Sequence, residues 1–279
     1  MARAGRSLVP WLPALAAALA LGALFAPTLG WLADTWRVHP YYTHGPLVVL
    51  AAAALTWRAR GVLAAGTPRG SGLLLIAAGV GLHLAAMPSG ARLPSMAGLL
   101  LVLAGAAWTA AGPAALRAMG LPLLLLAMAV PLPWVERLAP FLAARVAAVA
   151  ALLASGLGAD IEQVGAQLVV GDGVLAVGAP CSGLRSLVAM ATLAVLLAGL
   201  LDGPRKRRVL LVLAAIPLAL AANGLRLTAL LWVAHLRGAE TGLALFHGPI
   251  LAPLIYSIAA VILVAVSRGL GFDVRPATL

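Results

Sequence analysis

Long apolar runs recur from one end of this 279-residue chain to the other, and they constrain its fold more than any other feature. Hydrophobic residues make up 63% of the chain and charged residues only 10%. Several runs approach or reach the ~20 residues that an α-helix needs to cross a bilayer. We therefore predict an all-α polytopic membrane protein in which residues 1–279 form a single membrane domain.

The charge of the chain is strongly positive, with 19 basic against 8 acidic residues and a net charge of +11. In a membrane protein such an excess is typical of basic loops retained in the cytoplasm, so it does not indicate nucleic-acid binding. The expected non-protein partner is the membrane lipid. The cluster Arg205–Arg208 marks a cytoplasmic loop, and the basic residues near both ends place both termini in the cytoplasm.

Eight transmembrane helices are expected. Their approximate ranges are 10–33, 44–57, 71–87, 95–111, 121–132, 182–201, 209–234 and 249–267. The apolar segment Phe141 to Leu157 would invert the orientation of the later helices if it crossed the membrane. We therefore expect it to form one interfacial helix on the outer side.

One stretch has the pattern of β-structure. The runs Gln167 to Val170 and Val174 to Val177 flank Gly171-Asp172-Gly173, which is a turn signal between two short extended segments. This predicts a small extracytoplasmic hairpin that leads into the segment containing Cys181.

Cys181 is the single cysteine of the chain, in Pro180-Cys181-Ser182-Gly183-Leu184-Arg185-Ser186. Ser182 or a neighbour can cap the helix that follows, which would put the thiol near a helix N-terminus. Arg185 adds a second positive charge one turn further on. Both features favour a thiolate, so we expect a pKa below the usual ~8.5 and predict that Cys181 is a nucleophile. The alternative is that Cys181 is only a small buried hydrophobic residue.

Arg226 lies inside the seventh expected helix, roughly 13 Å below its outer end at ~1.5 Å per residue. An arginine at that depth indicates a functional site, although a buried ion pair or a side chain that reaches the interface would also account for it. Asn223 is three residues earlier on the same helix face and can orient a partner or bond to the backbone.

Two histidines precede Gly-Pro pairs at the expected outer starts of helices. His44 stands before the second helix and His247 before the eighth. Histidine exchanges a proton near neutral pH, so either can serve as a general acid or base, and their positions alone do not separate them. Cys181, Arg226 and a histidine together suit acyl transfer through a thioester. A single cysteine and scattered histidines offer no metal-ligand spacing, so neither a metal nor a cofactor is expected.

The Cys181 motif, Asn223-Gly224-Leu225-Arg226 and His247 together resemble the exosortase/archaeosortase family, as does Tyr42-Thr43-His44-Gly45. The resemblance covers most of the chain. It implies a cysteine protease or transpeptidase of the cytoplasmic (inner) membrane whose active site faces outward. Cys181, Arg226 and His247 match the catalytic residues of that family. It leaves Arg185, Asn223, His44 and Ser182 as supporting or substrate-binding residues.

The resemblance also implies the partners. They would be exported proteins that end in a short sorting motif (PEP-CTERM-like), a transmembrane helix and a basic tail. Two other classes remain open from the residues themselves. One is a transporter whose buried arginines bind an anionic solute, and the other is a non-catalytic component of surface-polysaccharide export.

Overall fold

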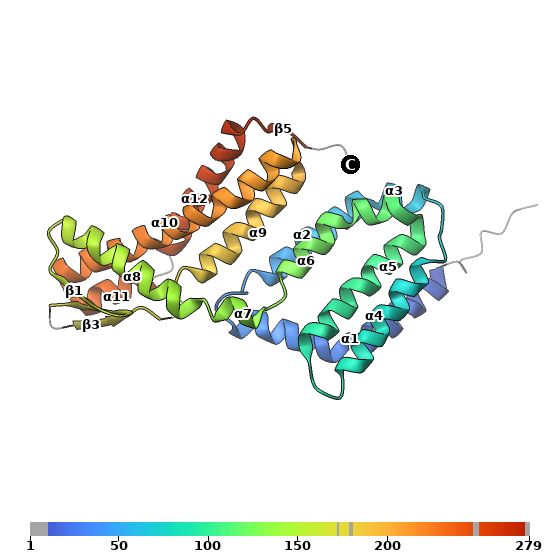
Figure 1. The fold of residues 1–279 in the computed structure, drawn as a ribbon, viewed down its shortest axis with the longest axis horizontal. Helices are drawn as coiled ribbons and strands as arrows, with labels where there is room; N and C mark the ends of the chain where they lie inside the picture. Colours follow the sequence, from blue (N-terminus) through green and yellow to red (C-terminus); the bar gives the residue numbers. More distant parts are fainter. Residues whose placement is uncertain (1–10, 172, 179–180, 248–250, 277–279) are drawn as a thin grey trace, which may run out of the picture.

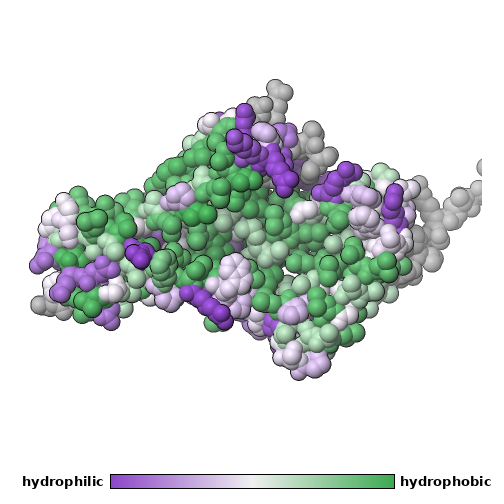
Figure 2. Space-filling model, in the orientation of Figure 1, coloured by the Kyte–Doolittle hydropathy of each residue, from purple (hydrophilic) through white to green (hydrophobic). Residues whose placement is uncertain are grey.

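A computed structural model describes residues 11–171, 173–178, 181–247 and 251–276. These residues form an all-α membrane protein with two small β-sheets, as the apolar runs predict. Helices α1–α6 make one group, and α8–α12 make a second group on the other side of the short helix α7 (Figure 1). Apolar residues cover most of the surface in the view of Figure 2, whereas hydrophilic residues gather toward its edges.

The first group opens with a long helix whose end leads to the second helix through a short turn. The helices are α1 (Trp11–Val38), α2 (Gly45–Arg58), α3 (Arg60–Ala65), α4 (Gly72–Ala86), α5 (Arg92–Ala118) and α6 (Gly120–Met128). Trp36 donates its indole N–H to the carbonyl oxygen of Ala129 at 2.9 Å, which fixes the end of α1 to the end of α6. This bond holds the connection between α1 and α2 close to the end of α6, after which the chain enters α7 and the second group.

Helices α4 and α5 approach each other through glycines. A Cβ added at Gly79 would lie 2.5 Å from the Gly98 carbonyl oxygen, and one at Gly98 would lie 2.5 Å from the Gly79 carbonyl oxygen. Gly72 and Gly105 face each other in the same way one heptad along, at 2.7 and 2.8 Å. Small residues of this kind allow helix backbones to approach closely where no hydrophobic effect drives association.

The second group is organised around one very long helix. Its elements are α8 (Ala139–Gly156), α9 (Leu184–Leu200), α10 (Arg205–Arg237), α11 (Ala239–His247) and α12 (Leu251–Gly269), and α7 (Pro133–Glu136) precedes them. Buried side chains of α8 and α10 share a core with the strands, while α9, α10 and α12 share another. Helix α10 therefore contacts every large element of this group.

The predicted hairpin is present and is part of a larger sheet. Strands β1 (Ile161–Val164), β2 (Gln167–Val170) and β3 (Gly173–Ala176) pair antiparallel in the order β1-β2-β3, with Val170 opposite Gly173. The first strand was not expected. It joins β2 through a two-residue turn that begins at Gly165, whose φ of 63° suits a glycine.

A second, two-stranded sheet lies at the other end of α9. Strand β4 (Leu201–Asp202) pairs with β5 (Asp273–Pro276), and Arg207 donates to the Gly271 carbonyl oxygen at 2.9 Å. The basic α9–α10 loop and the segment after α12 are thus held together. The sequence predicts both for the cytoplasmic side, and that orientation stays a prediction.

By length and composition, four helical segments of the described chain could each cross a membrane: Leu15–Val38, Arg92–Ala118, Pro133–Gly156 and Arg205–Arg237. Four shorter apolar helices accompany them: Gly45–Arg58, Gly72–Ala86, Leu184–Leu200 and Pro253–Gly269. The correspondence with the eight expected spans is incomplete. The expected fifth span, residues 121–132, appears as the nine-residue α6, which is well short of ~20 residues.

The segment expected at the interface also differs. Helices α7 and α8 form a continuous apolar stretch, Pro133–Gly156, that is long enough to span. Helix α8 buries a row of alanines, among them Ala147, Ala150 and Ala154, against the core that it shares with α10 and the strands. Its interfacial placement stays a prediction. Helix α5 runs beyond the expected 95–111 to Ala118, with non-helical backbone at Ala111 and Gly112.

The glycine contact between α4 and α5 gives a test of the fold. Gly79→Ala should lower the free energy of unfolding by about 1–3 kcal/mol, because its methyl group would overlap the backbone of α5. Gly81→Ala lies on the same helix with no atom within 4 Å of the added Cβ, so it should be neutral or slightly stabilising. Thermal unfolding in detergent compares the two variants. Equal stability would contradict the close approach.

Candidate active site

Cys181 lies in the short connection between β3 and α9. Its side chain is half-buried and packs against the core shared by α8, α10 and the strands. Helix α9 begins three residues later, at Leu184, after Gly183 in the left-handed conformation at φ 80°. The N-cap of α9 is Gly183, which has no side chain to cap the helix, and the Ser182 hydroxyl accepts a hydrogen bond from the Leu184 N–H at 3.3 Å. The thiol is therefore close to the helix start and not within its first turn.

Asn223 holds the cysteine connection to α10. Its side-chain amide N–H donates to the Cys181 carbonyl oxygen at 2.9 Å, and Asn223 itself is 2% exposed. A Cβ at Gly183 would lie 3.0 Å from the Asn223 amide nitrogen. A glycine is thus required there twice, by its positive φ and by this close contact. This hydrogen bond is one of the two interactions expected for Asn223, and its role in the site stays a prediction.

Arg226 lies one turn further along α10, buried at 9% exposure. One guanidinium N–H donates to the Tyr256 hydroxyl at 3.4 Å, and the guanidinium carbon is 6.0 Å from the centre of the Tyr256 ring. The same hydroxyl donates to the Asn223 side-chain oxygen at 3.4 Å. Tyr256, on α12, therefore links the arginine to the asparagine that holds the cysteine connection.

The α1–α2 connection covers the other side of the site. Tyr41 is 3% exposed and hydrogen-bonds to the Ser182 side chain. Arg185 donates its Nε–H to the Pro40 carbonyl oxygen. The expectation that Arg185 acts on the thiol is therefore not supported: it fastens α9 to the N-terminal helices, and Arg226 is the cation that acts on Cys181.

The prediction that the pKa of Cys181 is lowered is wrong. Burial raises the pKa of the thiol, and the opposing influences of the Arg226 guanidinium and of a hydrogen bond to the Gly178 backbone do not outweigh it. The sequence reveals the nearby charges but not the burial. At neutral pH the resting thiol is mostly protonated, so a nucleophilic Cys181 requires a base.

The two candidate bases occupy different positions. His44 is the residue directly before α2, as expected, and its half-buried ring has a pKa lowered by burial. Its Nε2 is buried with no hydrogen-bond partner among the described residues. His247 closes α11 and does not begin the last helix, so the two are not equivalent in the fold. The side chain of His247 lies outside the described residues.

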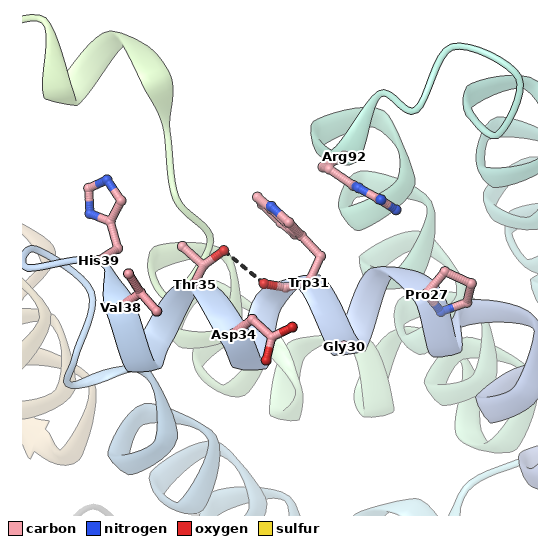
Figure 3. Close-up of a pocket in the computed structure, with 8 residues that line it drawn as sticks. All are labelled: Pro27, Gly30, Trp31, Asp34, Thr35, Val38, His39 and Arg92. Carbon is pink, nitrogen blue, oxygen red and sulfur yellow. Dashed lines mark hydrogen bonds between the residues drawn. The ribbon is translucent and has the colours of Figure 1, made fainter.

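A separate hollow of about 650 Å³ follows α1 and the first turn of α5 (Figure 3). In this view Trp31 of α1 and Arg92 of α5 lie between Pro27 at one end and His39 at the other. The His39 Nε2 is 3.2 Å from a Glu136 carboxylate oxygen of α7. Neither Cys181 nor Arg226 lines this hollow, so it is distinct from the thiol site. Among the described residues no group of three or more His, Cys, Asp or Glu side chains is placed to hold a metal ion.

The fold and the site define an integral membrane protein whose single thiol is held between β3 and α9 beside a buried arginine. Residues 36–265 match the family model described as Transmembrane exosortase (Exosortase_EpsH). The chain therefore belongs to the transmembrane exosortase family. The matched region contains Cys181, Asn223, Arg226 and Tyr256. A search of curated proteins and a search of solved structures each returned no match.

Sequence reasoning missed two residues of the site. Tyr41 precedes the Tyr42-Thr43-His44-Gly45 segment but was not singled out, and Tyr256 lies in an otherwise apolar helix. A buried phenol usually has a hydrogen-bond partner, so a tyrosine in an apolar helix could have been recognised from the sequence as a residue with a polar contact. Its partner could not be predicted, because α10 and α12 meet only through packing.

The opposing influences on the thiol give a test. Arg226→Gln should raise the pKa of Cys181 further, because it removes the positive charge that favours the thiolate. The rate of alkylation against pH measures this directly. Arg185→Gln is the matched control and should leave the profile unchanged. Equal shifts in both variants would show that Arg185 also acts on the thiol.

Proposed function

We propose that this protein is a membrane-embedded cysteine protease or transpeptidase that cleaves C-terminal sorting signals of exported proteins. In this proposal it lies in the cytoplasmic membrane, in bacteria the inner membrane, with its site facing outward and both termini inside. Family membership supports the class of activity. The observation that carries the proposal for this chain is the hydrogen-bonded connection from Cys181 through Asn223 and Tyr256 to Arg226.

The reaction would begin with the thiol in its protonated form, since burial raises its pKa. A histidine takes the proton as the sulfur attacks the scissile carbonyl carbon. A C–S bond forms, the carbonyl oxygen becomes an oxyanion, and collapse of this intermediate breaks the C–N bond. The histidine then returns the proton to the leaving amine. An acceptor nucleophile, or water, finally attacks the thioester and releases the product.

Arg226 has two roles in this scheme. It lowers the cost of forming the thiolate, and its guanidinium can stabilise the oxyanion in a site shielded from solvent. Tyr256 and Asn223 act as positioning residues: the phenol orients the guanidinium, and the amide fixes the backbone that carries the thiol. Ser182, Arg185 and Tyr41 secure the start of α9 against the α1–α2 connection.

The substrate would bring its own transmembrane helix into the bilayer beside the bundle. Its motif would then reach the cysteine connection at the outer side, with its basic tail in the cytoplasm. Because the substrate helix already holds the scissile bond near Cys181, less translational and rotational entropy is lost on reaching the transition state.

Loss of the thiol tests the proposal. Cys181→Ala should abolish cleavage of a reporter that carries a sorting signal, and it should prevent trapping of a thioester. Ser155→Ala, an exposed change on α8, serves as the control and should keep full activity. Both proteins are compared at equal membrane levels. Normal processing by Cys181→Ala would exclude the cysteine mechanism and favour a transporter or a non-catalytic role.

The two histidines are separated by kinetics. We expect His247→Ala to lower the maximal rate roughly 10²–10⁴-fold and to slow thioester formation, as loss of a general acid–base group does. We expect His44→Ala to keep much of the maximal rate and mainly to raise the substrate concentration required. Steady-state rates and thioester trapping with purified protein measure both. The opposite pattern would exchange the two roles.

A further inference from the structure

A groove between α6, α9 and α10 lies far from Cys181, at the end of α9 where β4 begins. It encloses about 390 Å³. Its lining comes from α6 and from the consecutive helices α9 and α10, which are distant from α6 in sequence: Gly120, Leu121, Leu124, Val195, Ala198, Gly199, Arg205, Arg208, Val209, Val212 and Leu213.

The groove is apolar along most of its length. Apart from two arginines, every lining residue is Gly, Ala, Val or Leu. Leu124, Val209 and Leu213 are about half exposed, at 49%, 51% and 53%, so the walls are open to whatever surrounds the helices. In a membrane protein this surface is accessible to an acyl chain.

The two arginines lie together at the start of α10. Arg205 is exposed, while Arg208 is half-buried and donates from Nη2 to the Leu201 carbonyl oxygen at 3.3 Å. The Nε of Arg208 is buried and has no hydrogen-bond partner among the described residues. Within the part of the chain that the structure describes, no acidic side chain lines the groove. The pair therefore offers charge and donors without a carboxylate to neutralise them.

We propose that this groove binds one anionic phospholipid, with an acyl chain between α6 and α10 and the phosphate on Arg205 and Arg208. Guanidinium groups form charge-assisted hydrogen bonds with phosphate oxygens, and basic residues at a membrane surface attract anionic lipid. The bound lipid would join α6, from the first group of helices, to α9 and α10, from the second. The binding does not depend on the proposed peptidase activity.

Charge decides between the possible occupants. A membrane helix that ends in a basic tail would bring like charges against both arginines, so it is disfavoured here. A zwitterionic lipid offers a phosphate, but its own cationic headgroup reduces the net attraction. A free phosphate ester lacks the chain that the apolar walls would cover.

The full-length protein in detergent tests the proposal by native mass spectrometry and by its melting temperature. Dioleoyl phosphatidylglycerol should remain bound as a single copy and raise the melting temperature. Arg205→Gln with Arg208→Gln should weaken this binding roughly 30-fold, because each interfacial basic side chain contributes about fivefold. The matched control replaces two exposed basic residues outside the groove, Arg58→Gln with Lys206→Gln, and should bind normally.

A second pair of variants tests the apolar part. Leu213→Trp places a bulky side chain in the groove and should reduce binding, whereas Leu210→Trp, exposed on the same helix outside the groove, should not. This pair decides the question if the double arginine variant fails to fold. Equal binding of phosphatidylcholine, binding of glycerol phosphate alone, preference for a basic-tailed helical peptide, or equal loss in the controls would overturn the proposal.

Discussion

The hydrogen bond from Asn223 to the Cys181 carbonyl is the contact on which the arrangement of the site depends. The N–H of Cys181 bonds within its own segment, to the Gly178 carbonyl oxygen at 3.0 Å, whereas its carbonyl oxygen needs a partner from elsewhere. Asn223 supplies that partner from the middle of a long helix, where the backbone is rigid. Because Tyr256 bonds to both Asn223 and Arg226, the position of the thiol relative to the cation is set by α10, α12 and the β3–α9 connection together.

Burial and charge act on the thiol in opposite directions, and burial is the stronger. This outcome favours a resting cysteine that is unreactive toward incidental electrophiles and becomes nucleophilic only when a base removes its proton. The arginine then matters most while negative charge is developing, which is where an interaction accelerates a reaction. In such a site the cysteine reacts only when a base and a substrate are both in place.

Much of the fold could be predicted from the sequence, because apolar runs and glycine turns are local signals. The pair β2–β3 follows from Gly171 and Gly173, whereas β1 was missed because its four residues show no clear alternation around Glu162 and Gln163. Asn223 bonds to the Cys181 backbone and Arg226 lies near the thiol, whereas the expected convergence of His247 with Cys181 and Arg226 stays a prediction. Arg185 and Tyr256 could not be placed, since their partners lie in segments that meet only through packing, and the acidity of Cys181 depends on burial that a linear sequence does not show.

The length of α10 bears on how close the site lies to the water outside the membrane. Its 33 residues extend roughly 50 Å, well beyond the ~30 Å hydrocarbon layer. Arg226 lies roughly 31 Å from Arg205 along this helix, so if Arg205 marks one edge of the hydrocarbon, Arg226 reaches the opposite edge. On that placement, Arg226 and the nearby thiol would lie at the edge of the headgroup layer and not in the middle of the hydrocarbon. A charged side chain is tolerated at such a depth, and an acceptor or a water molecule could reach the thiol from outside without crossing lipid.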